Sequence, residues 1–220
     1  IETKDLDGVA GQRFSVCMDV KKAEDGTYQY LFSMGQDTTR GGLYGNFLSN
    51  NKVRFGLYRD NTVTTSAYPS DAGIWVHWCF VFNSEGNTFA IHRDGVAQDL
   101  SRPAALGTTS ASGPLFLGVD KWRTDSNGYY HYPFSGAMDE VRVFAGHALS
   151  QAEVSSLMAN PTTDGLGLVL ALTFDAGAGN LGKDYSCRGV GDAVSVTDVA
   201  AVTGKECGSV DSSALATCSR

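Results

Sequence analysis

The chain has 220 residues, a formal net charge of −7 and 17 basic residues spread thinly along its length. Without a basic stripe to follow a phosphate backbone, the sequence argues against nucleic acid as a partner. Its longest apolar run, residues 166–174, is about half of the roughly 18 to 20 residues that span a bilayer, so membrane insertion is not expected. Its 26 glycines, polar turn clusters and single convincing helix predict a mainly β domain.

The first part of the chain contains short alternating segments that are typical of strands. Residues 14–20 alternate apolar and polar side chains, a turn follows at Asp25-Gly26, and residues 28–34 predict a second strand. We expect these two strands to form a hairpin.

The middle of the chain predicts three consecutive antiparallel strands. Residues 75–82 are apolar on both faces, which indicates a strand that is covered on both sides. Residues 88–92 predict the next strand, and a tight turn follows at Asp94-Gly95, where glycine accepts the positive φ of a type I′ turn. His77, in the first of these strands, is expected to be a packed residue rather than a catalyst.

Residues 137–144 predict a strand with two distinct faces. One face carries Ala137, Asp139, Val141 and Val143, and the other carries Met138, Glu140, Arg142 and Phe144. A carboxylate on a mostly apolar face needs a cation or several hydrogen-bond donors. Asp139 is therefore a candidate metal ligand, with an arginine partner or backbone N–H groups as the structural alternatives.

A short helix is predicted directly after this strand. Ser150 and Glu153 have the spacing of a capping box, and Asn160 is followed by a proline that stops the helix. The apolar stripe of this helix consists of Val154, Leu157 and Met158.

Two motifs in these segments resemble those of one known family. The pattern G-x-M-D-E-V-R-V-F at residues 136–144, followed by A-L-S-x-x-E, is similar to the closing segment of laminin-G-like domains of the concanavalin A-like lectin/glucanase superfamily. The W-x-H-W strand at residues 75–78, followed by D-G-V at residues 94–96, resembles a second motif of that family. The resemblance implies an all-β fold, namely a jelly-roll β-sandwich of two antiparallel sheets with one short helix.

The resemblance also implies a calcium site. Relatives often hold a structural calcium ion with an aspartate at the D-E-V-R position, which is Asp139 in this chain. Calcium takes about six to eight oxygen ligands, and we expect Asp175, at the end of the apolar run, to be the second carboxylate.

The last part of the chain departs from the order of the family. Relatives usually begin with an apolar strand that ends in Phe-Asp and is followed by D-x-S, whereas this chain has that pattern at residues 174–175 and 184–186. We expect residues 1–220 to form a single domain, in which residues 166–220 complete the sandwich in permuted order. The alternative is that residues 166–220 begin a further repeat.

Residues 120–132 form the most aromatic loop of the chain. Aromatic rings suit the flat apolar faces of sugars, and binding groups often collect on loops of a rigid sandwich. Core packing of alternate rings is the competing explanation. The candidate ligand-binding residues of this loop are Trp122, Arg123, Tyr129, Tyr130 and His131. A neighbouring rim could contain Arg40, Tyr44, Tyr58 and Arg59.

Five cysteines leave the disulfide pairing open. Cys17 and Cys79 lie in predicted strands, where a bridge and two buried thiols fit the pattern equally well. Cys187, Cys207 and Cys218 lie in a polar tail with little core of its own, and we expect at least one disulfide there. Disulfides favour an extracellular or cell-surface location.

Together these features predict a non-catalytic, extracellular carbohydrate-binding or adhesion module, stabilised by calcium and part of a larger protein. The alternative is a protein-interaction or structural repeat of a cell-surface or matrix protein. A glycoside hydrolase is the less favoured hypothesis, because the E-x-D-x-x-E strand of the glucanases in this superfamily is absent from the sequence. Asp139 and Glu140, adjacent in a strand, are expected to point to opposite faces and so not to flank one glycosidic bond.

Overall fold

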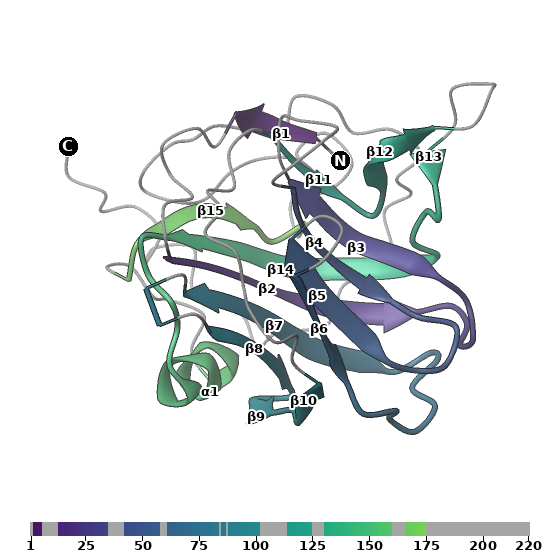
Figure 1. Cartoon of the computed structure of the whole chain (residues 1–220), viewed down its shortest axis with the longest axis horizontal. Coiled ribbons are helices and arrows are strands. Elements are labelled where there is room, and N and C mark those ends of the chain that lie inside the picture. The colour runs from purple at the N-terminus through teal and green to yellow at the C-terminus, as the bar shows by residue number, and fades with distance from the viewer. Residues whose placement is uncertain are drawn as a thin grey trace.

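The computed structural model describes residues 2–5, 13–34, 42–57, 61–83, 85–86, 88–101, 114–124, 130–159 and 166–174. These residues form two antiparallel sheets packed face to face, a separate two-stranded hairpin and one helix (Figure 1). The fold is the jelly-roll sandwich that the sequence predicts.

The seven-stranded sheet has the order β1 (Glu2–Asp5), β11 (Pro114–Leu117), β3 (Gln29–Met34), β4 (Leu43–Phe47), β5 (Val53–Leu57), β6 (Asn61–Thr65) and β10 (Leu100–Ser101). The six-stranded sheet has the order β15 (Leu168–Leu172), β14 (Gly136–Ala145), β2 (Arg13–Lys22), β7 (Trp75–Asn83), β8 (Thr88–Arg93) and β9 (Val96–Ala97). The hairpin consists of β12 (Asp120–Thr124) and β13 (Tyr130–His131), and α1 spans Gln151–Ala159.

One hydrophobic core fills the space between the two sheets. The ring of Phe80, from β7, lies 5.2 Å from that of Phe32 in β3 and 5.3 Å from that of Phe55 in β5, measured between ring centroids. Gly45 in β4 lies beside Phe32, and a Cβ at this position would collide with the ring. The close approach of ring and backbone therefore explains why glycine occupies this strand position.

A second apolar cluster lies on the opposite side of the six-stranded sheet, where α1 covers it (Figure 1). Val154 and Leu157 of the helix pack there against strand residues that include Cys17 and Cys79. These two cysteines are direct partners in β2 and β7, and they form a disulfide with Cα atoms 4.0 Å apart. Of the two possibilities that the sequence leaves open for this pair, a bridge or two buried thiols, the structure shows the bridge.

The predicted capping box begins α1. The Ser150 N–H donates to Glu153 Oε2 at 2.6 Å, and the Glu153 N–H donates to Ser150 Oγ at 3.3 Å. The prediction for Met158 is wrong, because this side chain is 42% exposed instead of forming part of the buried stripe. In this short helix Val154 and Leu157, three residues apart, are the side chains that face the sheet.

The predicted hairpin of the first two strands is also wrong. β2 belongs to the six-stranded sheet and β3 to the seven-stranded sheet, so the turn at Asp25-Gly26 crosses from one layer to the other. The physical reason is that β2 pairs with β14 on one side and with β7 on the other. Both of its edges are occupied, and no edge remains for β3.

A β-bulge changes the predicted face of Asp139. Between Asp139 and Arg142, β14 contains one residue more than the paired segment of β2, and Glu140 has a φ of 52°. The extra residue shifts the alternation, so Val141 faces the core while Asp139 lies on the opposite face, beside Asp19. The expectation that Asp139 shares a face with Val141 and Val143 is therefore wrong.

Candidate functional site

A row of polar side chains crosses the outer face of the seven-stranded sheet, the face that points away from the core. In β4, Leu43 and Phe47 point into the core, so Tyr44 and Asn46 point outward. In β5 the same alternation turns Arg54 outward. Cross-strand pairing then aligns one row over five strands: Tyr30, Asn46, Arg54, Thr64 and Ser101.

Four tyrosine rings gather at one end of this row. The rings of Tyr28 and Tyr30 lie 5.8 Å apart, and those of Tyr30 and Tyr44 lie 5.6 Å apart, between centroids. Tyr132 extends the cluster, because its ring lies 4.7 Å from Tyr28 and is 40% exposed. We call these four residues the tyrosine cluster. Tyr30 and the neighbouring Asn46 are buried. The accessible part of this surface therefore comes from Tyr132 and from the partly exposed Tyr28 and Tyr44.

Arg54 joins the row to the tyrosine cluster. Its Nη1 donates to the phenol oxygen of Tyr28 at 3.2 Å, and its Cζ lies 6.0 Å from the centre of that ring. Arg54 also lies close enough to Tyr44 to oppose the rise that burial causes in the pKa of its phenol. Within the described part of the chain, no carboxylate forms an ion pair with Arg54. The hydroxyl and ring of Tyr28 therefore hold this cation in place.

The phenols of Tyr30 and Tyr44 stay protonated at neutral pH. Burial raises the pKa of Tyr30 well above its ordinary value, and the carboxylate of Asp120 adds to this shift. Burial also raises the pKa of Tyr44, although Arg54 acts in the opposite direction. Each hydroxyl group can thus both donate and accept hydrogen bonds.

The segment that carries the predicted aromatic loop is fixed to β3 by backbone hydrogen bonds. The Tyr30 N–H donates to the Tyr132 carbonyl oxygen at 3.0 Å, and the Gly118 N–H donates to the Leu31 carbonyl oxygen at 2.8 Å. The hydroxyl of Ser33 donates to the Val119 carbonyl oxygen at 3.0 Å. These bonds hold both ends of the segment against the strand that carries Tyr30, and β12 contacts β3 (Figure 1).

The structure places the backbone of four of the five predicted loop residues in this hairpin. Trp122 and Arg123 belong to β12, and Tyr130 and His131 belong to β13. Their side chains, and Tyr129 as a whole, lie outside the described residues. The prediction that these five side chains bind a ligand therefore stays a prediction.

Sequence reasoning named Tyr44 as a rim residue but missed Tyr28, Tyr30 and Arg54. The missing signal is the pairing register, because Arg54 comes from β5, whereas Tyr28 and Tyr30 lie just before and at the start of β3, and the three meet only across the sheet. The other predicted rim residues, Arg40, Tyr58 and Arg59, lie outside the described residues.

The predicted metal ligands do not form a complete site within the described residues. Asp139 is buried next to Asp19, and its Oδ1 accepts a hydrogen bond from the Glu140 N–H at 2.9 Å. Asp175 lies outside the described residues. Among the residues that are described, no three histidine, cysteine, aspartate or glutamate side chains gather closely enough to hold a metal ion. The described residues thus supply two neighbouring carboxylates, which is fewer oxygens than calcium needs.

Asp19 also contacts His77 on this face of the six-stranded sheet. Both side chains are buried, and His77 Nδ1 lies 2.8 Å from Asp19 Oδ1. His77 Nε2 is buried and makes no hydrogen bond within the described part of the chain. The predicted packed histidine is thus satisfied at one ring nitrogen by the aspartate of the neighbouring strand.

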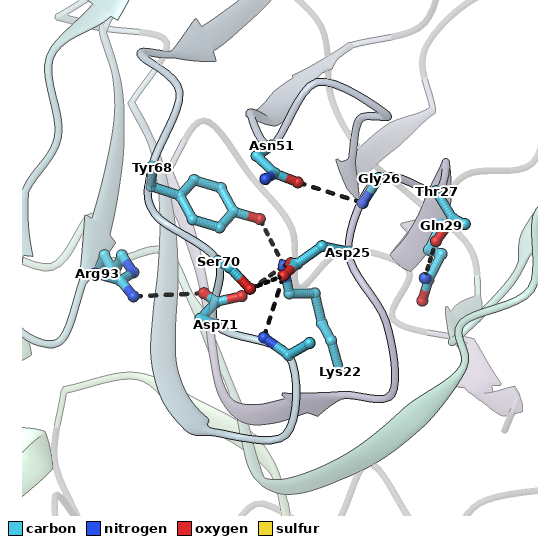
Figure 2. A network of polar contacts seen from close by, with 11 residues as sticks. Lys22, Asp25, Gly26, Thr27, Gln29, Asn51, Tyr68, Ser70, Asp71 and Arg93 are labelled. Carbon is cyan, nitrogen blue, oxygen red and sulfur yellow. Dashed lines mark hydrogen bonds and ion pairs between the residues drawn. The ribbon is translucent and has the colours of Figure 1, made fainter.

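A second polar cluster, shown in Figure 2, surrounds Lys22 at the end of β2. The Lys22 ammonium pairs with Asp25 and lies 2.5 Å from Asp71, and it donates to the Tyr68 hydroxyl at 3.1 Å. Arg93 lies 3.4 Å from Asp71, so two cations balance two carboxylates. The cluster ties the turn between the sheets to the loop before β7, which indicates a structural role.

The network favours the charged forms of Lys22 and Asp25, because it raises the pKa of the ammonium and lowers that of the carboxyl group. Burial alone would lower the pKa of Lys22, but hydrogen bonds to Asp25, Asp71 and Tyr68 outweigh it and raise the pKa. Burial raises the pKa of Tyr68 to about 12, against the effect of Lys22. The balanced and fully partnered ammonium is a poor candidate for chemistry with a ligand.

The sandwich, with an aromatic and polar outer face on one sheet, defines a jelly-roll domain of the lectin type. The chain belongs to the concanavalin A-like lectin/glucanases superfamily, since a laminin G family model of this superfamily matches residues 1–155. The family resemblance inferred from the sequence motifs is thereby confirmed. No curated protein matches the chain in sequence.

Solved structures with the same fold share little sequence with this chain. A candidate carbohydrate binding protein from Bacteroides ovatus has a TM-score of 0.59 and 14% identity, and the match covers 80% of this chain and 53% of that one. A heptameric SAP-like pentraxin from Limulus polyphemus has a TM-score of 0.52 and 18% identity, with 71% of each chain covered. At these identities the likeness establishes the fold alone.

A third similar structure contains a sugar. The CBM40 domain of the Ruminococcus gnavus IT-sialidase, bound to α2,3 sialyllactose, has a TM-score of 0.50 and 16% identity. The match covers 67% of this chain and 83% of that one.

In the described part of the chain, no helix is long enough and apolar enough to cross a bilayer.

Proposed function

We propose that the protein is a non-catalytic carbohydrate-binding module that holds a sugar on the outer face of its seven-stranded sheet. The observation that carries this proposal is the arrangement of the tyrosine cluster beside Arg54 and Thr64, the two partly exposed residues in the middle of the polar row. Sugars combine apolar C–H faces with hydroxyl groups, so stacked rings beside fixed polar side chains suit them.

Family membership and the similar structures support this proposal. The superfamily is one of lectins and glucanases, and two of the similar structures are described as carbohydrate-binding. Binding without catalysis is favoured, because retaining and inverting glycosidases need a pair of carboxylates flanking the bond that they cleave. The glucanase motif that supplies such a pair is absent from the sequence.

An extracellular location and a larger parent protein are part of the proposal. The disulfide between Cys17 and Cys79 supports an oxidising compartment. The chain spans about half the length of the Bacteroides ovatus protein that it resembles, which is compatible with a module of a longer polypeptide.

Calcium is proposed as a structural ion bound through Asp139 and Asp175. The adjacent Asp19 supports the idea of a site rich in carboxylates next to Asp139. We expect calcium added to metal-free protein to raise the melting temperature, and Asp139→Asn to abolish that rise. Equal melting temperatures in calcium and in EDTA would rule out calcium as a structural ion of this protein.

A protein-interaction module is the second candidate. A shallow groove between α1 and the turn after β8 is lined by Asp94, Gly95, Val96, Ser155, Met158 and Ala159. Val96 is 63% exposed and Met158 42% exposed, so the groove presents apolar surface to solvent. This surface could contact another protein of the cell surface or matrix.

A glycan array probed in calcium and again in EDTA tests the proposal. The expected result is binding to a defined set of glycans, and sensitivity to EDTA would add calcium to the binding mechanism. Tyr28→Ala should weaken binding, whereas Val96→Ala in the groove should leave it unchanged. Absence of binding to every glycan in both conditions would favour the protein-interaction module instead.

A further inference from the structure

We infer that the sugar bound by this face is acidic, and that Arg54 pairs with its single anionic group. The inference rests on the proposed function, because it assigns the class of sugar to the same surface. The anionic group is a carboxylate or a sulfate on one sugar residue, and the neighbouring tyrosine rings contact the apolar side of that sugar.

Arg54 differs from the other cations with described contacts. Arg13 pairs with Glu85, Arg142 pairs with Glu140, and Lys22 and Arg93 share Asp71. Arg54 instead donates to the Tyr28 hydroxyl, and no carboxylate of the described residues pairs with it. In a protein with a net charge of −7, a cation without an anionic partner in the described structure is available for an anion from outside.

The geometry fixes the guanidinium before any ligand arrives. Its hydrogen bond to Tyr28 and its position over that ring use part of its donor capacity. A guanidinium has five N–H donors arranged in a fixed fork, so donors remain for a bidentate contact with a carboxylate or sulfate. Because Tyr28 already orders the side chain, binding costs little additional side-chain entropy.

The surroundings of Arg54 suit one negative charge and not many. The protonated phenols of Tyr30 and Tyr44 add no negative charge of their own. The buried carboxylate of Asp120 acts on the same phenols, and the net charge of the whole chain is negative. Both features oppose a polyanion such as heparin, and they favour a mostly neutral glycan with one acidic group.

The hydroxyl groups of the row extend the binding surface away from Arg54. Thr64 lies directly across from Arg54 in β6, and Ser101 lies across from Thr64 in β10. The Ser101 hydroxyl donates to the Thr64 carbonyl oxygen at 3.1 Å, which orders this end of the row. A glycan anchored at Arg54 can therefore continue either over the tyrosine cluster or toward Thr64.

Matched pairs of neutral and acidic sugars test the inference. Lactose and 3′-sialyllactose form one pair, and N-acetyllactosamine with and without a 6-sulfate forms the other. We expect at least one acidic member to bind about tenfold more tightly than its neutral partner or better. This preference should shrink as salt is raised, because the added contact is ionic. Isothermal titration with the full chain measures each affinity.

Variants of Arg54 separate charge from shape. Arg54→Gln should reduce the ratio of the affinities for the acidic and the neutral sugar to about one. Arg54→Lys should keep part of this preference for the acidic sugar. The exposed control Lys21→Gln should leave the ratio unchanged. Equal affinity for the neutral and acidic members in the unmodified protein, or an unchanged preference in Arg54→Gln, would overturn the inference while leaving sugar binding intact. Tighter binding of heparin than of both acidic probes would overturn the assignment of a single anionic group. Failure to bind any sugar would overturn the proposed function as well.

Discussion

Lys22 lies between the carboxylates of Asp25 and Asp71, and its side chain is nearly inaccessible to water. Removing one member of a buried ion pair typically costs about 3–5 kcal/mol, because the remaining charge loses its partner. We predict that Lys22→Met lowers the free energy of unfolding by about this amount. Urea denaturation with an unchanged m-value measures the effect.

The neighbouring lysine provides the control for this prediction. Lys21 is exposed and precedes Lys22 in the same strand. Lys21→Met should change the free energy of unfolding by no more than about 0.5 kcal/mol. Similar losses for both variants would mean that the network in Figure 2 contributes no specific stability.

His92 makes the stability of the fold dependent on pH. Burial lowers its pKa below 6.5, a hydrogen bond with Gln151 of α1 opposes this, and the nearby His77 adds to the lowering. The unfolded chain therefore binds a proton at this position more readily than the folded one, so stability is lost as pH falls below about 6.5. We predict a melting temperature that decreases from pH 7.5 to pH 5, with a smaller decrease in His92→Gln.

His147→Gln serves as the comparison, since His147 is partly exposed and pairs with Glu153 at the start of α1. The melting temperature of this variant should still decrease between pH 7.5 and pH 5, by most of the amount seen in the unmodified protein. The carboxyl groups of Asp25 and Glu153, whose pKa values are lowered, make stability depend on pH only below this pH range. Identical pH profiles for the unmodified protein and His92→Gln would rule out His92 as the cause.

At the scale of elements, the disulfide joins β2 to β7 across one pair of facing residues. Cys17 and Cys79 are separated by 62 residues, and closing a loop of that length in the unfolded chain corresponds to about 4 kcal/mol in the chain-entropy model. We predict that the double variant Cys17→Ala/Cys79→Ala loses about that much stability in urea denaturation. A midpoint equal to that of the unmodified protein would contradict the bridge.

Sequence patterns predicted many of the elements but not how they pair. The alternation of residues 14–20 and the capping box at Ser150 depend on neighbours in sequence, and both predictions are confirmed. The hairpin prediction failed because a turn sequence does not reveal whether the flanking strands have free edges. The prediction of which face of the strand carries Asp139 was wrong, because nothing in the sequence marks the bulge at Glu140.

At the level of the whole molecule, the last described strand contributes to the main core. β15 pairs with β14, and Leu170 is fully buried in the main core. We predict that Leu170→Ala costs about 2–5 kcal/mol, as is usual for a leucine removed from a packed core. Met158→Ala, at a side chain that is 42% exposed, should cost far less. An equally small effect of Leu170→Ala would mean that residues 166–174 contribute little to this sandwich.

The candidate site could be predicted only in part, because it is a property of the assembled sheet. Backbone hydrogen bonds hold the aromatic segment of residues 120–132 against β3, beside the tyrosine cluster, and ligand binding by its side chains stays a prediction. Tyr30, Asn46 and Arg54 form one row only after the register of three strands is known. Calcium binding through Asp139 and Asp175 stays a prediction.

The proposed function places a bound sugar on the outer face of the seven-stranded sheet. Hydrogen exchange of the full chain, with and without the glycan that binds best on the array, locates the bound sugar. We predict slower exchange in β3, β4 and β5, which carry Tyr30, Tyr44 and Arg54, and in the backbone next to Tyr132. Slower exchange confined to α1 and the turn at Asp94-Gly95, with β3 to β5 unchanged, would contradict this prediction.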